Sequence, residues 1–257
     1  MTKELLSAEN IIASIEPCHL PRLSKLDIFD TIESTNTYLL ALAKSGPTGW
    51  ACFAEQQTQG RGRLGRRWFS PHGTNIYCSL LWRFPREQDI SGLSIAIGVM
   101  IANTLKQYGV TAGIQLKWPN DILFAGRKLS GILLERSGEA VIIGIGVNLE
   151  LPNNSENTWI ALSDITGKPI KRNHFAGLLM NELLAKCPLY QTQGLPAFLS
   201  EWRQHDFLIG KNITLHQSEK QISGIMQGIN SAGELLLKNE EGILRSFRAG
   251  EASLKSI

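Results

Sequence analysis

The chain has 257 residues, of which 43% are hydrophobic and 19% charged, and its formal net charge is +3. This is the composition of an ordinary globular protein, with one large domain or one domain plus a small appendage, that buries a core without disulfide bonds. A charge of +3 is too small to indicate nucleic-acid binding, so any electrostatic function must come from local clusters of charge.

The cysteines and the apolar segments exclude several further classes of protein. The four cysteines, Cys18, Cys52, Cys78 and Cys187, form no CxxC pair, which argues against a zinc site or a disulfide framework and favours reduced thiols in a cytoplasmic protein. The N-terminus lacks the long apolar core of a signal peptide. The most apolar stretch, 93–105, is too short to span a bilayer, so we expect a soluble protein with a buried helix there and no membrane partner.

In chain order, residues 1–26 predict a short helix and a connector bounded by Pro17 and Pro21. Ser34-Thr35-Asn36 forms the cap of a helix that stops at Gly46-Pro47. The further strands that we expect are 50–55, 74–84, 114–118, 122–124, 128–135 and 140–149, and the further helices are 91–109, 173–187 and 195–205. The turn at 125–127 predicts a hairpin between two of these strands.

After Asp206 the pattern changes to short strand-like runs at 212–216, 221–229, 234–238 and 243–248, separated by Gly, Asn and Ser. Closely spaced strands of this kind are typical of a small β-barrel. The larger part mixes strands and helices without strict βαβ alternation, which favours an α+β fold with a mixed or antiparallel sheet. We therefore predict an N-terminal extension at 1–26, a catalytic domain at 27–207 and a β-rich domain at 208–257.

The loop GRGRLGRR at 60–67 is the most distinctive segment. Its glycines fit GxGxxG, but a Pro and a strand pattern follow where a dinucleotide-binding loop needs a helix. The four arginines, Arg61, Arg63, Arg66 and Arg67, lie on a flexible glycine-rich backbone. A mobile cationic loop that orders around an anionic ligand is one interpretation, and a solvated basic loop or an RNA contact is equally compatible with the composition.

Two further segments carry polar groups or glycines at strand ends. Lys117, Asn120 and Asp121 follow an apolar strand and are joined by Lys128, which indicates either a charged site or an ordinary type I turn. Gly144 and Gly146 interrupt an apolar strand, which indicates either close approach of a ligand or another backbone, or a bulge.

Together these segments resemble the biotin–protein ligase family. The matching motifs occur in the family's order: ESTN at 33–36, GRGRLGR at 60–66 followed by Trp68, KWPND at 117–121, RKLSGIL at 127–133, GIGVN at 144–148 and GEASL at 250–254. The resemblance covers roughly residues 26–257 and implies a catalytic domain like that of class II aminoacyl-tRNA synthetases, followed by an SH3-like barrel. It also implies ATP-dependent activation of biotin to biotinyl-5'-AMP and transfer to a lysine of a biotin carboxyl carrier protein.

The resemblance assigns roles to individual positions. For biotin binding it implies Ser34, Thr35, Asn36, Gln57, Gly60, Arg61, Gly62, Arg63, Ser79, Lys128, Gly131, Gly144 and Gly146. For the nucleotide it implies Arg63, Arg66, Trp68, Asn120, Lys128, Asn148 and Trp159, and for catalysis Lys128, Arg63, Lys117 and Asp121. ATP and Mg²⁺ are the expected cofactors. The Mg²⁺ ligands are not identified by the motifs, and Asp121 is one candidate.

One departure and two alternatives accompany this interpretation. Only 32 residues precede ESTN, too few for the winged helix-turn-helix of many bacterial members, so we expect no operator DNA binding and an N-terminal segment packed on the catalytic domain. The expected partner is the carrier domain of acetyl-CoA carboxylase or a similar carboxylase, and monomer and homodimer remain open. The alternatives are a lipoate or octanoate ligase on the same fold and an RNA-binding module using the arginines.

Overall fold

The computed structural model describes residues 4–152, 156–217 and 220–255. The larger sheet contains β1 (Lys25–Ile32), β2 (Trp50–Gln57), β3 (Ile76–Arg83), β4 (Ile114–Lys117), β5 (Asp121–Phe124), β6 (Arg127–Ser137) and β7 (Ala140–Val147). The helices are α1 (Ala8–Ile12), α2 (Thr35–Ala41), α3 (Leu93–Gln107), α4 (Leu162–Thr166), α5 (Arg172–Gln193) and α6 (Leu199–His205). Short 3-10 turns occupy η1 (Leu20–Arg22), η2 (Arg63–Gly65) and η3 (Leu195–Phe198).

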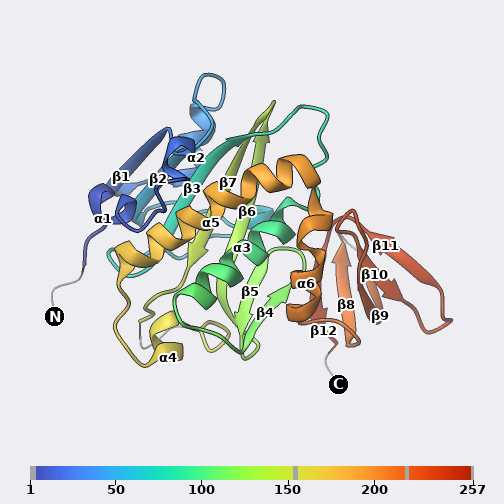
Figure 1. The fold of residues 1–257 in the computed structure, drawn as a ribbon. Coiled ribbons are helices and arrows are strands. Elements are labelled where there is room, and N and C mark those ends of the chain that lie inside the picture. The colour runs from blue at the N-terminus through green and yellow to red at the C-terminus, as the bar shows by residue number, and fades with distance from the viewer. Residues whose placement is uncertain (1–3, 153–155, 218–219, 256–257) are drawn as a thin grey trace.

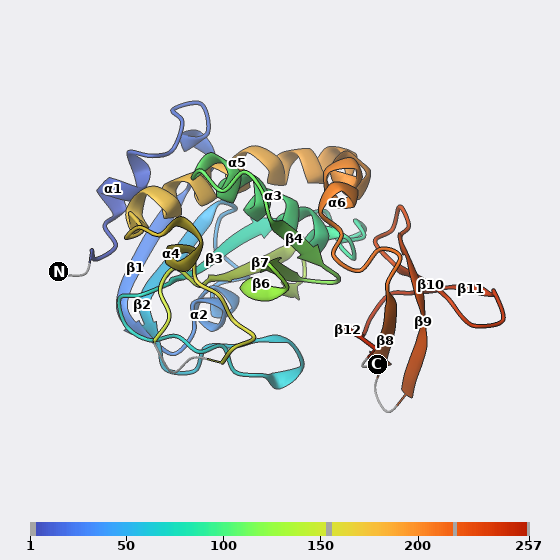
Figure 2. The same ribbon diagram turned by 90° about the horizontal axis from the view of Figure 1, so that it is seen from below.

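The larger sheet has the strand order β1-β2-β3-β7-β6-β5-β4. Only β1 and β2 pair in parallel, and the other neighbours are antiparallel. This mixed sheet confirms the predicted α+β class. In Figure 1 and Figure 2, α3 and α5 cover one face of the sheet, whereas α2 lies on the opposite face.

Helix α3 forms the centre of the apolar layer, between α5 and the strands. Its residues are buried on nearly every side from Leu93 to Ala102, which explains why this part of the helix is apolar almost all round rather than along one stripe. The buried-helix interpretation of 93–105 is thus confirmed. Among the described residues, no helix has the length and hydropathy needed to cross a membrane.

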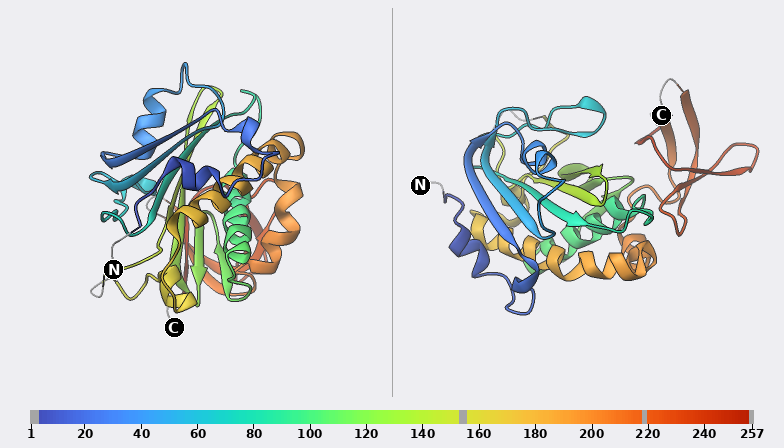
Figure 3. Two further views of the ribbon diagram at one scale, coloured as in Figure 1. Left: turned by 60° about the vertical axis from the view of Figure 1, so that its left-hand side comes forward. Right: turned by 90° about the horizontal axis from the view of Figure 1, so that it is seen from above.

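The C-terminal strands form a second sheet. They are β8 (Asn212–Gln217), β9 (Lys220–Ile229), β10 (Leu235–Lys238), β11 (Leu244–Phe247) and β12 (Glu251–Leu254). All recorded pairings are antiparallel, in the order β11-β10-β9-β8-β12. Figure 3 shows this sheet beside the main body, joined to it after α6. These strands agree with the β-rich segment predicted after Asp206, but the sequence pattern had not predicted β12.

Helix α5 runs to Gln193, past the expected end at 187, and includes Pro188. A proline has no N–H, so the Leu184 carbonyl one turn earlier loses its helical partner. The Arg22 guanidinium donates to that carbonyl over 3.3 Å. A side chain from the N-terminal segment thus supplies the missing hydrogen bond, which helps the helix continue through the proline.

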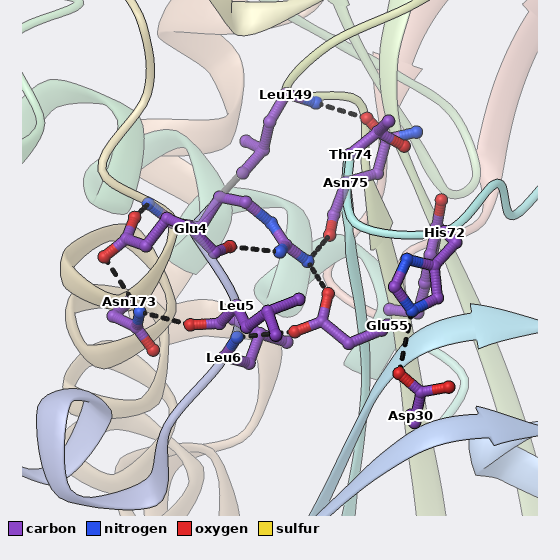
Figure 4. A network of polar contacts seen from close by, with 12 residues as sticks. Glu4, Leu5, Leu6, Asp30, Glu55, His72, Thr74, Asn75, Leu149 and Asn173 are labelled. Atoms are coloured by element: carbon purple, nitrogen blue, oxygen red, sulfur yellow. Dashed lines mark hydrogen bonds and ion pairs between the residues drawn. The ribbon is translucent and has the colours of Figure 1, made fainter. Parts of the chain in front are cut away.

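The described part of the N-terminal segment packs on α5, as expected. Asn181 accepts from the backbone N–H of Glu16 at 3.1 Å, and Asn173 accepts from that of Ser7 at 2.8 Å. Asn173 also donates to the Glu4 carboxylate at 2.8 Å, as Figure 4 shows. These buried amides pair with backbone that would otherwise lack partners, which fixes the segment's path.

Candidate functional site

A cavity of about 360 Å³ is lined in part by the start of α2, the helix that Figure 2 shows on the sheet face opposite α3 and α5. Strands β2, β3, β5, β6 and β7, the start of α2 and the segment after β2 contribute to it, together with residues 156 and 159 and one residue of β12. We call residues 58–70 the arginine loop; it appears in cyan on the same side as α2 in Figure 2. The expected site residues that line the cavity are Ser34, Thr35, Asn36, Gln57, Arg61, Gly62, Arg63, Arg66, Trp68, Asn120, Asp121, Lys128, Gly131, Gly144, Gly146 and Trp159.

One wall of the cavity is built on the N-terminus of α2. Ser34 caps the helix by accepting from the Thr37 N–H, which confirms helix capping as one role of this residue. The next residue, Thr35, donates to Gln57 Oε1 through its N–H at 3.0 Å and its hydroxyl at 3.2 Å. Gln57 Nε2 in turn donates to Ser70 at 3.0 Å. The start of α2 thus begins a row of hydrogen-bonded polar side chains that continues through Gln57 in β2 to Ser70.

The same wall continues through Asn36 and Ser79. The Ser79 hydroxyl lies 2.7 Å from Thr35 Oγ1 and 2.6 Å from Asn36 Oδ1. Asn36 Nδ2 donates to Glu135 at 2.9 Å, and Glu135 forms an ion pair of 2.9 Å with Arg61. Because these polar groups are largely buried, each hydrogen bond removes a desolvation penalty and holds its neighbour in one orientation.

The glycines of β6 and β7 leave room for side chains. A Cβ on Gly144 would lie 2.1 Å from Asn36 Oδ1, and one on Gly146 would lie 2.3 Å from the Trp68 ring. A Cβ on Gly131 would lie 3.0 Å from the same ring. The sequence indicated close approach of a ligand or another backbone, or a bulge. In this structure the approaching atoms are the side chains of Asn36 and Trp68, and β7 pairs in regular register at both of its glycines. The indole N–H of Trp68 is buried without a hydrogen-bond partner among the described residues.

Lys128 and Asp121 form the charged part of the cavity. Their side chains make an ion pair of 2.7 Å, and the ammonium lies 5.5 Å from the centre of the Trp68 ring. Adjacent strands carry the two residues, and the Lys128 backbone is fixed by hydrogen bonds with Thr158 and Ile160. The lysine is thus held by its backbone and its head group at once.

The arginine loop is joined to the C-terminal sheet. Arg63 donates to Asn120 Oδ1 at 3.0 Å and to the Gly250 carbonyl at 3.4 Å, and Arg66 forms an ion pair with Glu251. Burial lowers the pKa of Arg63, and the nearby carboxylates of Glu251 and Asp121 act in the opposite direction. A guanidinium stays charged at neutral pH despite such a shift, so the cavity keeps this fixed positive charge.

The loop also has internal order that its composition did not predict. The Trp68 N–H donates to the Gly60 carbonyl at 2.9 Å, and the Gly62 N–H donates to the Arg66 carbonyl at 2.7 Å. A Cβ on Gly60 would lie 2.4 Å from the Trp68 carbonyl oxygen. Gly60 therefore shapes the base of the loop and does not line the cavity.

Three more of the expected residues lie outside the cavity lining. Ser79 is fully buried behind it and acts through Thr35 and Asn36. Asn148 donates to the Lys128 carbonyl at 3.2 Å, so it supports the lysine's backbone. Lys117 lines a neighbouring crevice of about 460 Å³ between the KWPND turn, the arginine loop and strands β8 and β12. Lys117 and Lys128 therefore line different hollows, and Asp121 lines both of them.

The structure also brings in residues to which the sequence assigned no role. Glu135 joins Arg61 to Asn36, Ser70 supports Gln57, and Glu251 comes from strand β12. Phe69 stacks on Trp159, an expected residue that lines the cavity, with ring centres 6.3 Å apart. The GEASL motif carried a signal for Glu251, because it pointed to this segment without naming a function for it.

The carboxylates at the cavity allow a divalent cation but form no metal cage. Asp121, Glu156 and Glu251 line the cavity. In the described ranges, the only group of three metal-capable side chains within 4.8 Å is the surface set Glu16, Cys18 and His19, outside the cavity. Mg²⁺ commonly takes one or two carboxylates together with phosphate oxygens and water, which these residues can accommodate.

Comparison with known proteins gives consistent matches. A model of the biotin/lipoate A/B protein ligase family matches residues 28–148, and one of the biotin protein ligase C-terminal domain matches residues 208–255. The chain is 36% identical to the bifunctional ligase/repressor BirA of Escherichia coli, over 98% of this chain and 79% of BirA. It is 32% identical to the biotin–[acetyl-CoA-carboxylase] ligase of Mycobacterium tuberculosis, over 83% of each chain.

The fold matches as well. The biotin protein ligase from Aquifex aeolicus, solved in complex with biotin and ATP, superposes with a TM-score of 0.79 at 28% identity, covering 90% of this chain and 99% of that chain. Sequence motifs, cavity and fold agree with one another, and the chain belongs to the biotin protein ligase family.

Proposed function

We propose that this ligase activates biotin with ATP and transfers it to a lysine of a biotin carboxyl carrier protein. The observation that carries the proposal is the cavity itself, in which a neutral polar wall and a fixed cationic group meet. Biotin has the matching two ends, a neutral ureido ring and a carboxylate. The relative from M. tuberculosis, named for its action on acetyl-CoA carboxylase, supports a carrier domain of that kind as the acceptor.

The polar wall has spare hydrogen-bond donors for a ureido carbonyl. The Ser34 hydroxyl accepts from Thr37, and its own hydrogen has no acceptor among the described residues. Gln57 Nε2 uses one hydrogen on Ser70, and the Trp68 N–H has no partner in the described chain. An unpaired buried donor is unfavourable by about 1–3 kcal/mol, so a ligand with polar acceptors gains from this wall and a dithiolane ring does not.

In the first half-reaction a biotin carboxylate oxygen forms a bond to the α-phosphorus of ATP, and the bond from that phosphorus to the pyrophosphate oxygen breaks. Both reactants are anionic, so catalysis depends on positioning and on fixed positive charge. Lys128 and Arg63 supply that charge inside the cavity. Asp121, paired with Lys128, orients the ammonium. The crevice that contains Lys117, Arg63 and Arg66 is suited to the departing pyrophosphate.

Mg²⁺, when bound, would neutralise phosphate charge. Asp121, Glu156 and Glu251 are the carboxylates at the cavity that could contribute a ligand, with phosphate oxygens and water completing the shell. Trp159 and Phe69 offer aromatic faces for the adenine. In the second half-reaction a neutral lysine amine of the acceptor bonds to the acyl carbon, the bond from that carbon to AMP breaks, and the amine's extra proton passes to solvent.

Isothermal titration with biotin and with lipoate, each with and without ATP and Mg²⁺, tests the proposal. We expect biotin to bind and mass spectrometry to detect biotinyl-adenylate only when ATP is present. Adding a purified carrier domain should then yield a mass increase on one lysine, which a Lys→Arg acceptor should not show. Binding of lipoate in preference to biotin would move the assignment to the sister ligase.

A further inference from the structure

The Glu135 carboxylate, near the outer end of β6, bridges two parts of the chain that are distant in sequence. Its Oε1 lies 2.9 Å from the Arg61 guanidinium, and its Oε2 accepts from Asn36 Nδ2 at 2.9 Å. The Glu135 side chain is 18% exposed, whereas that of Arg61 is 45% exposed. Glu135 does not line the cavity, so any effect on a ligand must pass through these two neighbours.

The first consequence concerns the orientation of Asn36. A carboxylate accepts hydrogen bonds and cannot donate them, so it must face the amide nitrogen rather than the amide oxygen. With Nδ2 turned to Glu135, Oδ1 faces the Ser79 hydroxyl at 2.6 Å. Glu135, together with the Leu133 carbonyl 3.4 Å from Nδ2, therefore selects one of the two amide orientations and turns Oδ1 toward Ser79.

The second consequence concerns the arginine loop. From Asn36 the hydrogen bonds continue through the Ser79 and Thr35 hydroxyls, then from the Thr35 backbone N–H to Gln57, and through Ser70 to the Trp68 carbonyl oxygen. The series thus begins at Arg61 and ends at Trp68, both in the arginine loop. The loop and the polar wall therefore form one closed circuit. Among the described residues, the Arg61–Glu135 contact is the link that closes this circuit at Arg61.

We propose that Glu135 is a positioning residue that couples closure of the arginine loop to the orientation of the biotin-binding wall. The proposal rests on the proposed biotin-binding role of the cavity. A charged link with one exposed partner can open and re-form, whereas the buried part of the circuit stays in place. Opening at Arg61 releases the loop and removes one of the two partners that hold the Glu135 carboxylate. The carboxylate can then move, so the orientation of the Asn36 amide is held less firmly while the loop is open.

Steady-state kinetics of adenylate formation test the coupling, with Glu135→Gln, Arg61→Gln, the double variant and Glu139→Gln as a matched control on the same hairpin. We expect each single variant to raise KM for biotin about tenfold, the scale of one charge-assisted hydrogen bond, with KM for ATP unchanged. The effect of the double variant should fall short of the sum of the two single effects, because both single variants remove the same Arg61–Glu135 contact. Glu135→Asp, which keeps the charge, should recover part of the loss.

Hydrogen exchange without any ligand separates failure of this inference from failure of the proposed function. Glu135→Gln should speed exchange of the Trp68 and Gly62 amides, whatever the cavity binds. If Glu135→Gln exchanges these amides faster but the wild type does not turn over biotin, the link between Glu135 and the loop is upheld and biotin is rejected as the ligand. Unchanged exchange, additive effects in the double variant, or an equal rise in KM for ATP would each overturn the coupling.

Discussion

Arg172, the first residue of α5, forms an ion pair of 2.7 Å with Glu55 in β2, and each side chain is 4% exposed. The guanidinium also donates to the carbonyl of Glu4 at 2.6 Å and to that of Asn75 at 3.0 Å. Glu55 further accepts from the Leu6 N–H, as Figure 4 shows. One buried pair thus fastens the N-terminal segment, a strand of the sheet and the start of a helix.

Removing one partner of this pair should be strongly destabilising. Arg172→Met leaves the Glu55 carboxylate buried without its counter-charge, and breaking such pairs typically lowers the free energy of unfolding by about 3–5 kcal/mol. Urea denaturation followed by circular dichroism measures the loss. Lys171→Met, at the exposed neighbouring position, is the control and should stay within about 0.5 kcal/mol of the wild type. A similar small loss for Arg172→Met would contradict the anchoring role.

Replacing a glycine of β7 by alanine should impair biotin binding. In Gly144→Ala the new Cβ would lie 2.1 Å from Asn36 Oδ1, so the amide must move out of the polar wall. We expect biotin affinity to fall more than tenfold, with stability lowered by about 1–3 kcal/mol as for other overpacked sites. Gly98→Ala in α3 is the comparison, because its Cβ would meet nothing closer than 3.7 Å. That variant should gain about 0.5–1 kcal/mol and bind biotin normally.

Lys128→Ala should separate chemistry from folding. The ammonium and Asp121 are partly exposed, so their ion pair contributes little to stability. Loss of the positive charge at the reacting anions should slow pyrophosphate release at least about a hundredfold. Arg127→Ala, one residue earlier and exposed, should retain activity. Near-normal pyrophosphate release by Lys128→Ala would remove this residue from the proposed mechanism.

Asp27 should make stability depend on pH in the acid range. Partial burial pushes the pKa of Asp27 up, but hydrogen bonds from Trp50, Tyr38 and Lys25 outweigh it and leave the pKa below its ordinary value. A carboxyl with a depressed folded-state pKa stabilises the fold above its unfolded pKa of about 3.9, and this contribution disappears as the pH falls through the folded value. Denaturation between pH 6 and pH 3 should therefore show a smaller decline for Asp27→Asn. Parallel curves for the two proteins would refute the assignment.

The sequence predicted most of the fold because periodic burial is a local property. The apolar run of α3, the strands β2, β3 and β7 and the cap at Ser34 all follow from neighbouring residues. Strand β1 was not predicted, because its residues are only half-buried along the sheet edge and show no clear alternation. The length of α5 was also underestimated, since its passage through Pro188 is supported by Arg22, far away in the sequence.

Site residues could be predicted where they belong to a recognisable pattern in the sequence. They could not be predicted where their role depends on a contact with a residue far away in the chain. The motifs pointed to Thr35, Gln57 and Lys128, which the fold brings into one cavity. Nothing local distinguishes Glu135 from any acidic residue near the end of a strand, and its role depends on Arg61, 74 positions away. Lys117 lies with Asn120 and Asp121 as expected, but at a neighbouring crevice, because the motif gives its position in the chain and not the crevice that its side chain enters.

The anchoring of the arginine loop by Gly250 and Glu251 bears on how the protein is made. Synthesis proceeds from the N-terminus, and early segments begin to fold while later ones are still being added. The polar wall comes from residues 34–79, but the loop that covers it has no C-terminal anchor until residue 251 has left the ribosome. A nascent chain can therefore assemble the wall well before the loop above it is secured.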